Sequence, residues 1–167
     1  MLFRSDKIYP LNDRSVDTTD KKSLLPYQIN NLEVSQNKIA FLLFDIPSSI
    51  NGNHKIKLNL VPYVCVRKKN GACKKDAQHD GSVVSLNGEI EIYKYDYKGW
   101  GEKTDKKNIG IIDHSLGTKL ATLTSLENGT AVSVDLTDQI YSYGEEFSIA
   151  LKVSDPSDKV YFYSKEK

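Results

Sequence analysis

The sequence of 167 residues has little of several features that would reveal its class directly. It holds two cysteines, one tryptophan, one methionine and five prolines. It also lacks a surplus of either charge, with 23 Lys plus Arg against 22 Asp plus Glu. Proteins that bind nucleic acid or anionic membrane surfaces usually carry a basic excess. We therefore expect no nucleic acid among the partners of this chain.

Long apolar runs are also missing. No stretch is apolar enough to span a membrane, so no membrane insertion is expected. Residues 1–6 lack the apolar centre of a signal peptide. Two interpretations fit this start: an intracellular protein, or a module taken from a longer exported protein. The chain also contains no amphipathic helical run longer than about two turns, which argues against a helical fold.

What the chain does contain is β-branched and aromatic residues, including ten tyrosines, in short alternating runs. Such runs are typical of β-strands. The clearest region is residues 131–166, which predict three strands, with inward apolar side chains in 147–153 and at Val160 and Phe162. Asp135 or Thr137 is expected to cap a short helical turn between the first two strands. The sequence therefore predicts an all-β chain that forms a single domain over residues 1–167.

Two earlier stretches predict the centre of the sheet. Residues 38–45 are apolar on both alternating faces, so this strand is expected to be central or covered on its outer side. Residues 55–67 read as the longest strand, with Pro62 at a bulge or an edge because proline cannot donate to a β-ladder. One face of that strand is expected to carry Ile56, Leu58, Leu60, Val64 and Val66, with Tyr63 on the opposite face.

The two cysteines flank a strong tight-turn signal, Asn70-Gly71. That turn would fold Cys73 back towards Cys65, so a local disulfide is predicted, which would indicate an oxidising compartment. The alternative is two free thiols in a reducing compartment. A zinc site is not expected, because two cysteines at this spacing have no partner pair. The neighbouring lysine pairs, 68–69 and 74–75, form either a basic patch for an acidic glycan or a solvated loop.

The best candidate for ligand binding is the stretch of residues 93–103. It mixes aromatic faces, on which sugar rings can lie, with polar groups that can bind hydroxyls or carboxylates. The predicted ligand-binding residues are Tyr93, Tyr95, Tyr97, Trp100 and Lys103. The alternative for Trp100 is a place in the core at one end of the domain. A second aromatic set, Tyr141, Tyr143, Tyr161 and Tyr163, is either core or a contact with a neighbouring module.

Signs of catalysis are absent from the sequence. No serine or cysteine lies in a nucleophile elbow, and no glycine-rich phosphate loop is present. Asp135 and Asp138 are better explained as helix caps than as an acid and base pair. The three histidines, 54, 79 and 114, lie in or beside polar segments. We therefore predict that the chain is not an enzyme and has no catalytic residues. The Asn128-Gly129-Thr130 turn is also a glycosylation sequon, meaningful only in a eukaryotic secretory setting.

An ordered set of short motifs resembles the DNRLRE-type domains, a family also treated as carbohydrate-binding modules. The motifs are Phe44-Asp45, the strand in residues 56–66, Trp100-Gly101-Glu102, Val134 to Asp138, residues 149–152, and Phe162 to Glu166. They cover nearly the whole chain. The chain departs from the family pattern at Lys165, where arginine is usual, at the loop between the two cysteines, and in residues 21–27.

The resemblance implies a jelly-roll-like antiparallel β-sandwich with one short helical turn. It further implies a non-catalytic module of an extracellular or cell-surface protein, which favours excision from a larger exported protein. Its partner would be a polysaccharide or cell-surface glycan. The alternative is a structural or adhesive module of a surface appendage that contacts neighbouring modules or a protein receptor. No cofactor is expected. A structural calcium is common among jelly rolls, but no dense loop of Asp and Asn residues indicates one.

Overall fold

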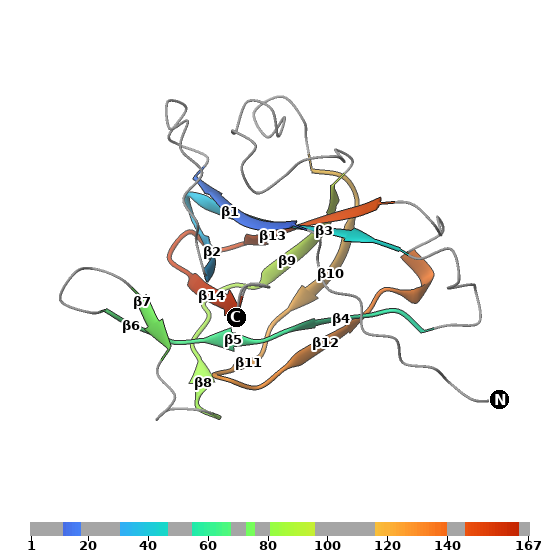
Figure 1. Ribbon diagram of the computed structural model, residues 1–167. Helices are drawn as coiled ribbons and strands as arrows, with labels where there is room; N and C mark the ends of the chain where they lie inside the picture. Colours follow the sequence, from blue (N-terminus) through green and yellow to red (C-terminus); the bar gives the residue numbers. More distant parts are fainter. Residues whose placement is uncertain are drawn as a thin grey trace.

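The computed structural model describes residues 12–17, 31–46, 55–67, 73–75, 81–95, 116–139 and 146–163, and these ranges are all-β apart from one short 3₁₀ turn (Figure 1). The strands are β1 (Asn12–Asp17), β2 (Asn31–Ser35), β3 (Lys38–Asp45), β4 (Lys57–Leu60), β5 (Pro62–Tyr63), β6 (Cys65–Arg67), β7 (Cys73–Lys75), β8 (Val83–Val84), β9 (Ile90–Tyr95), β10 (Lys119–Leu123), β11 (Leu126–Glu127), β12 (Val132–Asp135), β13 (Glu146–Val153) and β14 (Lys159–Tyr163).

An eight-stranded antiparallel sheet dominates the architecture. Its order is β10-β9-β13-β3-β2-β14-β5, and β1 also pairs with β3. The sheet curls, so that β3 and β13 lie across the top of Figure 1 while β5 lies below them. Three two-stranded ribbons accompany the sheet: β4 with β12, β8 with β11, and β6 with β7. The closing strands β13 and β14 are thus integrated between strands from the first two thirds of the chain.

The main core lies inside the curl. Inward side chains of the sheet, such as Leu42, Ile92 and Ile149, share one cluster with Leu58 of β4 and Val134 of β12. The β4–β12 ribbon therefore packs across the core from the large sheet. Full burial of a side chain such as Ile149 stabilises the fold by about 1.5–3 kcal/mol. This core positions the outer faces of β2, β14 and β5.

The expectation for residues 38–45 is confirmed. β3 pairs with β13 on one side and with β1 on the other. Leu42 faces the main core, whereas Phe41 and Leu43 belong to a second buried cluster on the opposite face. Strand β13 is likewise buried on both faces, because Ser148 and Ala150 are as buried as Ile149. An apolar pattern on both faces therefore marks β3 as a central strand, whereas the second face of β13 is buried with the small residues Ser148 and Ala150.

The expectation of one long strand over residues 55–67 is wrong. The chain forms β4, β5 and β6 instead, with breaks at Val61 and Val64. Leu58 and Leu60 face the main core, and Tyr63 lies on the opposite face, beside Tyr161, as predicted. The prediction for Val64 is wrong: it was expected to share the face of Leu58 and Leu60, but it is 38% exposed, and its amide leaves the ladder to donate to the Asn128 side chain. Pro62 lies on β5, the last strand in the order of the sheet, which agrees with the predicted edge position of a residue that cannot donate to a ladder.

The predicted short helical turn is confirmed over the part that the structure describes. A 3₁₀ turn spans Thr137–Gln139, and the Asp135 carboxylate accepts the Thr137 amide at 2.9 Å. The hydrogen bond from the Thr137 hydroxyl has the largest effect on the pKa of Asp135, followed by the bond from the Thr137 amide, and both lower it. The Thr137 hydroxyl oxygen accepts the Ile56 amide at 2.9 Å, which ties the turn to the start of β4. Asp135 is thus confirmed as a capping residue.

Strand β1 was not predicted from the sequence, and neither were the two-residue strands β8 and β11. Residues 12–17, which carry five polar side chains around Val16, form β1 along the edge of β3. Their composition contains no apolar alternation, because the strand is specified by pairing with β3 rather than by its own pattern. Lys7 to Pro10 and residues 108–115, whose short alternating runs also predict strands, lie outside the described residues.

Candidate functional site

The predicted ligand-binding stretch is only partly described. Tyr93 and Tyr95 lie on β9, while Tyr97, Trp100 and Lys103 lie outside the described residues, so their roles stay predictions. Tyr95 is 1% exposed, and its ring packs 4.9 Å from that of Phe41 in the second core cluster. The assignment of Tyr95 to a ligand surface is therefore corrected: this ring is a core residue. Because both faces of β9 are buried, its outward-phase tyrosines do not all reach the surface.

Tyr93 is half-buried and already engaged. Its hydroxyl donates to Glu91 on the same face of β9, and Lys119 of β10 pairs with the same carboxylate at 3.7 Å. The hydrogen bond to the carboxylate, with burial and the Glu91 charge, raises the pKa of Tyr93. A ligand at Tyr93 would meet a small closed network rather than a free aromatic face.

The two cysteines lie on a hairpin, as the turn signal predicts. Strand β6 pairs with β7 so that Cys65 is opposite Lys75 and Cys73 is opposite Arg67. The two cysteines therefore occupy diagonal positions of the ladder, two residues out of register with each other. The disulfide between Cys65 and Cys73 stays a prediction.

A different surface gathers aromatic and charged side chains on the outer side of β2, β14 and β5. We call it the outer tyrosine face, and it comprises Glu33, Ser35, Lys38, Tyr63, Lys159, Tyr161 and Tyr163. Tyr161 is the key position, because it lies opposite Glu33 on one side and opposite Tyr63 on the other. Directly opposite residues of antiparallel strands have Cβ atoms about 4.5–5.5 Å apart. The strand register therefore builds one continuous row across three strands.

Local sequence explains why these side chains point outward. Leu32 and Val34 of β2, and Val160 and Phe162 of β14, face the main core. Residues between them must face the other way, since successive side chains of a strand alternate. Glu33, Tyr161 and Tyr163 occupy those intervening positions, and all three are half-buried.

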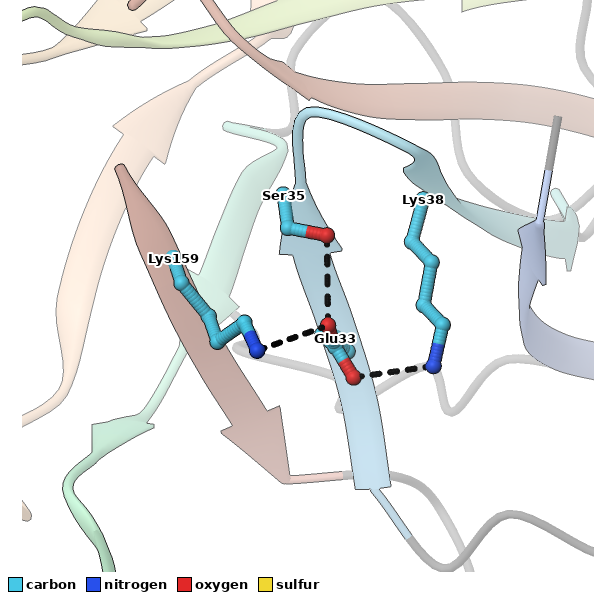
Figure 2. Close-up of polar contacts among 4 residues, drawn as sticks. All are labelled: Glu33, Ser35, Lys38 and Lys159. Atoms are coloured by element: carbon cyan, nitrogen blue, oxygen red, sulfur yellow. Dashed lines mark hydrogen bonds and ion pairs between the residues drawn. The ribbon is translucent and has the colours of Figure 1, made fainter. Parts of the chain in front are cut away.

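Glu33 is the electrostatic centre of this face. Its carboxylate accepts hydrogen bonds from the Lys38 ammonium at 3.0 Å and the Ser35 hydroxyl at 3.2 Å, and it pairs with Lys159 at 3.7 Å. Figure 2 shows the two lysines reaching Glu33 from opposite sides. The Glu33 side chain is 14% exposed, whereas that of Lys159 is 46% exposed. Two ammonium groups thus share one carboxylate, and Lys159 presents its charge to solvent.

Tyr63 supports the aromatic part of the face from below. It is 2% exposed, and its ring centroid lies 5.0 Å from that of Tyr163 and 5.7 Å from that of Tyr161. Burial, reinforced by the neighbouring Tyr161 and Tyr163 and by Glu33, raises the pKa of Tyr63 above its usual value. The tilted packing fixes the two outer rings without immobilising long, flexible side chains.

The arrangement suits binding better than catalysis. Two half-buried tyrosines on a rigid sheet supply flat apolar surface, and the adjacent carboxylate, ammonium and hydroxyl groups supply directed hydrogen bonds. Glu33 is the one acid among these side chains, so the face holds no carboxylate pair for glycoside hydrolysis.

Sequence reasoning found part of this face and missed the rest. Tyr161 and Tyr163 were recognised as an aromatic set, but Glu33, Tyr63 and the two lysines were not grouped with them. The alternation of β2 and β14 gave a usable signal, since it places Glu33 and both tyrosines outward. The pairing of β5 with β14, which brings Tyr63 beside them, had no such signal.

The other residues that the sequence offered as functional candidates have simpler explanations or lie outside the described residues. Of the two acids interpreted as caps, Asp135 caps a turn and Asp138 is exposed; the three histidines lie outside the described residues. Among the residues that the structure describes, no three His, Cys, Asp or Glu side chains form a group able to hold a metal ion. No helix in the described ranges has the length and hydropathy needed to cross a membrane.

The sequon asparagine is structural. Asn128 is fully buried, and its side-chain oxygen accepts the Val64 amide at 2.7 Å. Gly129 follows it with a positive φ of 75°, which closes the turn between β11 and β12. A glycan on Asn128 would require this turn to open, so the folded chain does not offer the sequon for modification.

Comparison with known proteins assigns no family to the chain. No family model matches the chain, and no curated protein matches it. The resemblance to DNRLRE-type domains therefore stays a prediction carried by the motifs themselves.

Proposed function

We propose that this chain is a non-catalytic carbohydrate-binding module of an extracellular or cell-surface protein, with its glycan site on the outer tyrosine face. The observation that carries the proposal is the row Glu33–Tyr161–Tyr63, bordered by Tyr163 and Lys159. Sugar rings pack their apolar faces on aromatic side chains, and their hydroxyls need nearby donors and acceptors. Both requirements meet within this one row.

The proposal extends to the fold and setting. The curled antiparallel sheet with a ribbon across its core supports a jelly-roll-like sandwich, in agreement with the motif resemblance. The predicted disulfide between Cys65 and Cys73 supports an oxidising, extracellular setting. Tyr97, Trp100 and Lys103 remain a second proposed contact region, outside the described residues.

Retention on immobilised neutral and acidic polysaccharides tests the proposal. The wild-type chain should be retained by at least one of them. Tyr161→Ala should weaken that retention by about tenfold or more, because losing the burial of one aromatic side chain costs about 1.5–3 kcal/mol. Tyr93→Ala is the matched tyrosine control and should bind normally. Lys159→Ala is tested in the same way, and its matched control is Lys152→Ala, which changes an exposed lysine on β13.

The possible results distinguish an error in the location of the glycan site from an error in the proposed function. Loss in Trp100→Ala or Tyr97→Ala, with normal binding by Tyr161→Ala, would move the glycan site to residues 93–103. Retention by none of the polysaccharides would contradict the glycan-binding function itself.

A structural or adhesive module is the second candidate, and one observation favours it. Val83 is 76% exposed and Val64 is 38% exposed. Both valines lie beside the turn at Asn128, because Val83 pairs with Glu127 and the Val64 amide donates to the Asn128 side chain. Exposed apolar side chains of this kind suit a protein contact. Sedimentation that shows self-association, lost in Val83→Ser, would favour this function over glycan binding.

A further inference from the structure

The loop before β9 contains an Asn-Gly pair, Asn87-Gly88, whose chemistry the proposed function does not use. In such a pair the glycine amide nitrogen can attack the asparagine side-chain carbonyl, because glycine has no side chain to hinder the approach. The attack requires a free amide nitrogen and a side chain able to swing towards it. Asn87 is exposed to solvent, so burial alone does not protect it.

In the folded chain both reacting groups are held. The Gly88 amide donates to Asp158 Oδ2 at 2.9 Å, and the Asn87 amide donates to Asp158 Oδ1 at 2.8 Å. The Asn87 side-chain nitrogen donates to the Ser157 hydroxyl at 2.8 Å. Asp158 is 5% exposed, so its carboxylate has few competing water contacts. A charge-assisted hydrogen bond of this kind withholds the Gly88 nitrogen from reaction.

The rest of the loop is docked on the β13–β14 turn. The Glu89 amide donates to the Ser154 hydroxyl, and the Ser154 amide donates back to the Glu89 carbonyl. Gly88 approaches the turn so closely that an added Cβ would lie 2.4 Å from Ser154 Oγ. The geometry therefore leaves the Asn87 side chain little freedom to rearrange.

We propose that Asn87 is a latent deamidation site, kept unreactive because Asp158 and Ser157 hold the two groups that must react. In the reaction the Gly88 nitrogen bonds to Asn87 Cγ, its proton passes to the side-chain nitrogen, and ammonia leaves. Water then opens the cyclic imide to aspartate or isoaspartate. The product adds a carboxylate beside Asp158 and removes the donor to Ser157, so the loop detaches from the turn once it has reacted.

Of the three other Asn-Gly pairs in the sequence, Asn128-Gly129 lies within the described residues and supplies an internal control. The Gly129 amide donates to the Pro62 carbonyl, and Asn128 is fully buried and bound to the Val64 amide. Neither contact involves Asp158 or Ser157. Opening of the β13–β14 turn should expose Asn87 but not Asn128, whereas global unfolding should expose both.

Peptide mapping by mass spectrometry after incubation at neutral pH tests the proposal on wild type, Asp158→Asn and Ser157→Ala. Folded wild type should deamidate at Asn87 at least about tenfold more slowly than the same chain in denaturant. Asp158→Asn should accelerate Asn87 by about tenfold with Asn128 unchanged. Ser157→Ala changes an exposed residue and should fold normally, with a smaller acceleration confined to Asn87.

Each possible result either supports or overturns the proposal. Equal Asn87 rates in folded and denatured wild type would overturn the proposal. If Asp158→Asn accelerates both asparagines equally, that variant has unfolded, and Ser157→Ala becomes decisive. A selective rise at Asn87 in Ser157→Ala supports the proposal, and an unchanged rate overturns it.

Discussion

At the scale of single residues, three aspartates hold turns through their side-chain oxygens. Asp135 accepts the Thr137 amide, Asp155 accepts the Ser157 amide and hydroxyl, and Asp158 accepts two amides of the neighbouring loop. Sequence alone marks such residues as potential caps, acids or metal ligands. The hydrogen bonds give all three a structural role.

Asp158→Asn should destabilise the chain by about 2–4 kcal/mol, because a hydrogen bond to a charged group is worth about 1.5–3 kcal/mol and this buried carboxylate makes two. Urea unfolding at neutral pH measures the change. Asp138→Asn is the matched control, since Asp138 is exposed, and it should stay within about 0.5 kcal/mol of wild type. Equal stability of the two variants would contradict the role assigned to Asp158.

The Asp135 cap should make stability depend on pH. Its pKa is lowered in the folded chain, so its contribution is fully present above the unfolded pKa of about 4 and is lost as the pH falls through the folded value. Asp135→Ala should therefore be less stable than wild type at pH 7, and the difference should shrink in acid. Urea unfolding over a range of pH checks this, and a difference independent of pH would refute it.

At the scale of strands and loops, the sequence predicted the elements whose burial follows their own alternation. Strands β2, β3, β13 and β14 lie where expected, because one or both of their faces are lined by apolar residues. The prediction failed where pairing or a backbone break decides the outcome. Strand β1 is polar and exists through its ladder with β3, and the chain breaks at Val64, which alternation alone would place in the core.

The same limits apply to the candidate site. Alternation is enough to place Tyr161, Tyr163 and Glu33 outward. It cannot show that three separate strands bring Tyr63 and Lys159 beside them, since that requires the register of β2, β14 and β5. It also misplaced Tyr95, because a strand buried on both faces has no outward phase.

The docked loop before β9 gives a prediction at this scale. Gly88→Ala should destabilise the chain by about 1–3 kcal/mol, because the added Cβ would lie 2.8 Å from Asp155 Cβ as well as meeting Ser154. Ser85→Ala, which changes an exposed residue of the same loop, is the control and should stay within about 0.5 kcal/mol of wild type. Thermal unfolding compares the two, and a harmless Gly88→Ala would mean that the loop is not docked as described.

At the scale of the whole molecule, the main core fixes the outer tyrosine face. Phe162 and Val34 anchor β14 and β2 in the core, so the outward residues between them are carried on rigid strands rather than on loops. Such a surface can bind a glycan without paying for much side-chain ordering. The proposed glycan site therefore lies on a sheet face, while the proposed deamidation site lies in the loop before β9, docked against the turn that joins β13 and β14.

The most direct test of this placement is NMR titration of the wild-type chain with an oligosaccharide of whichever glycan retains it. We expect the NMR signals of Tyr161, Tyr163 and Lys159 to shift together and to saturate with one affinity. Signals of Tyr95, in the second core cluster, should stay unchanged. Saturable shifts confined to residues 93–103, with the outer tyrosine face silent, would contradict the central claim.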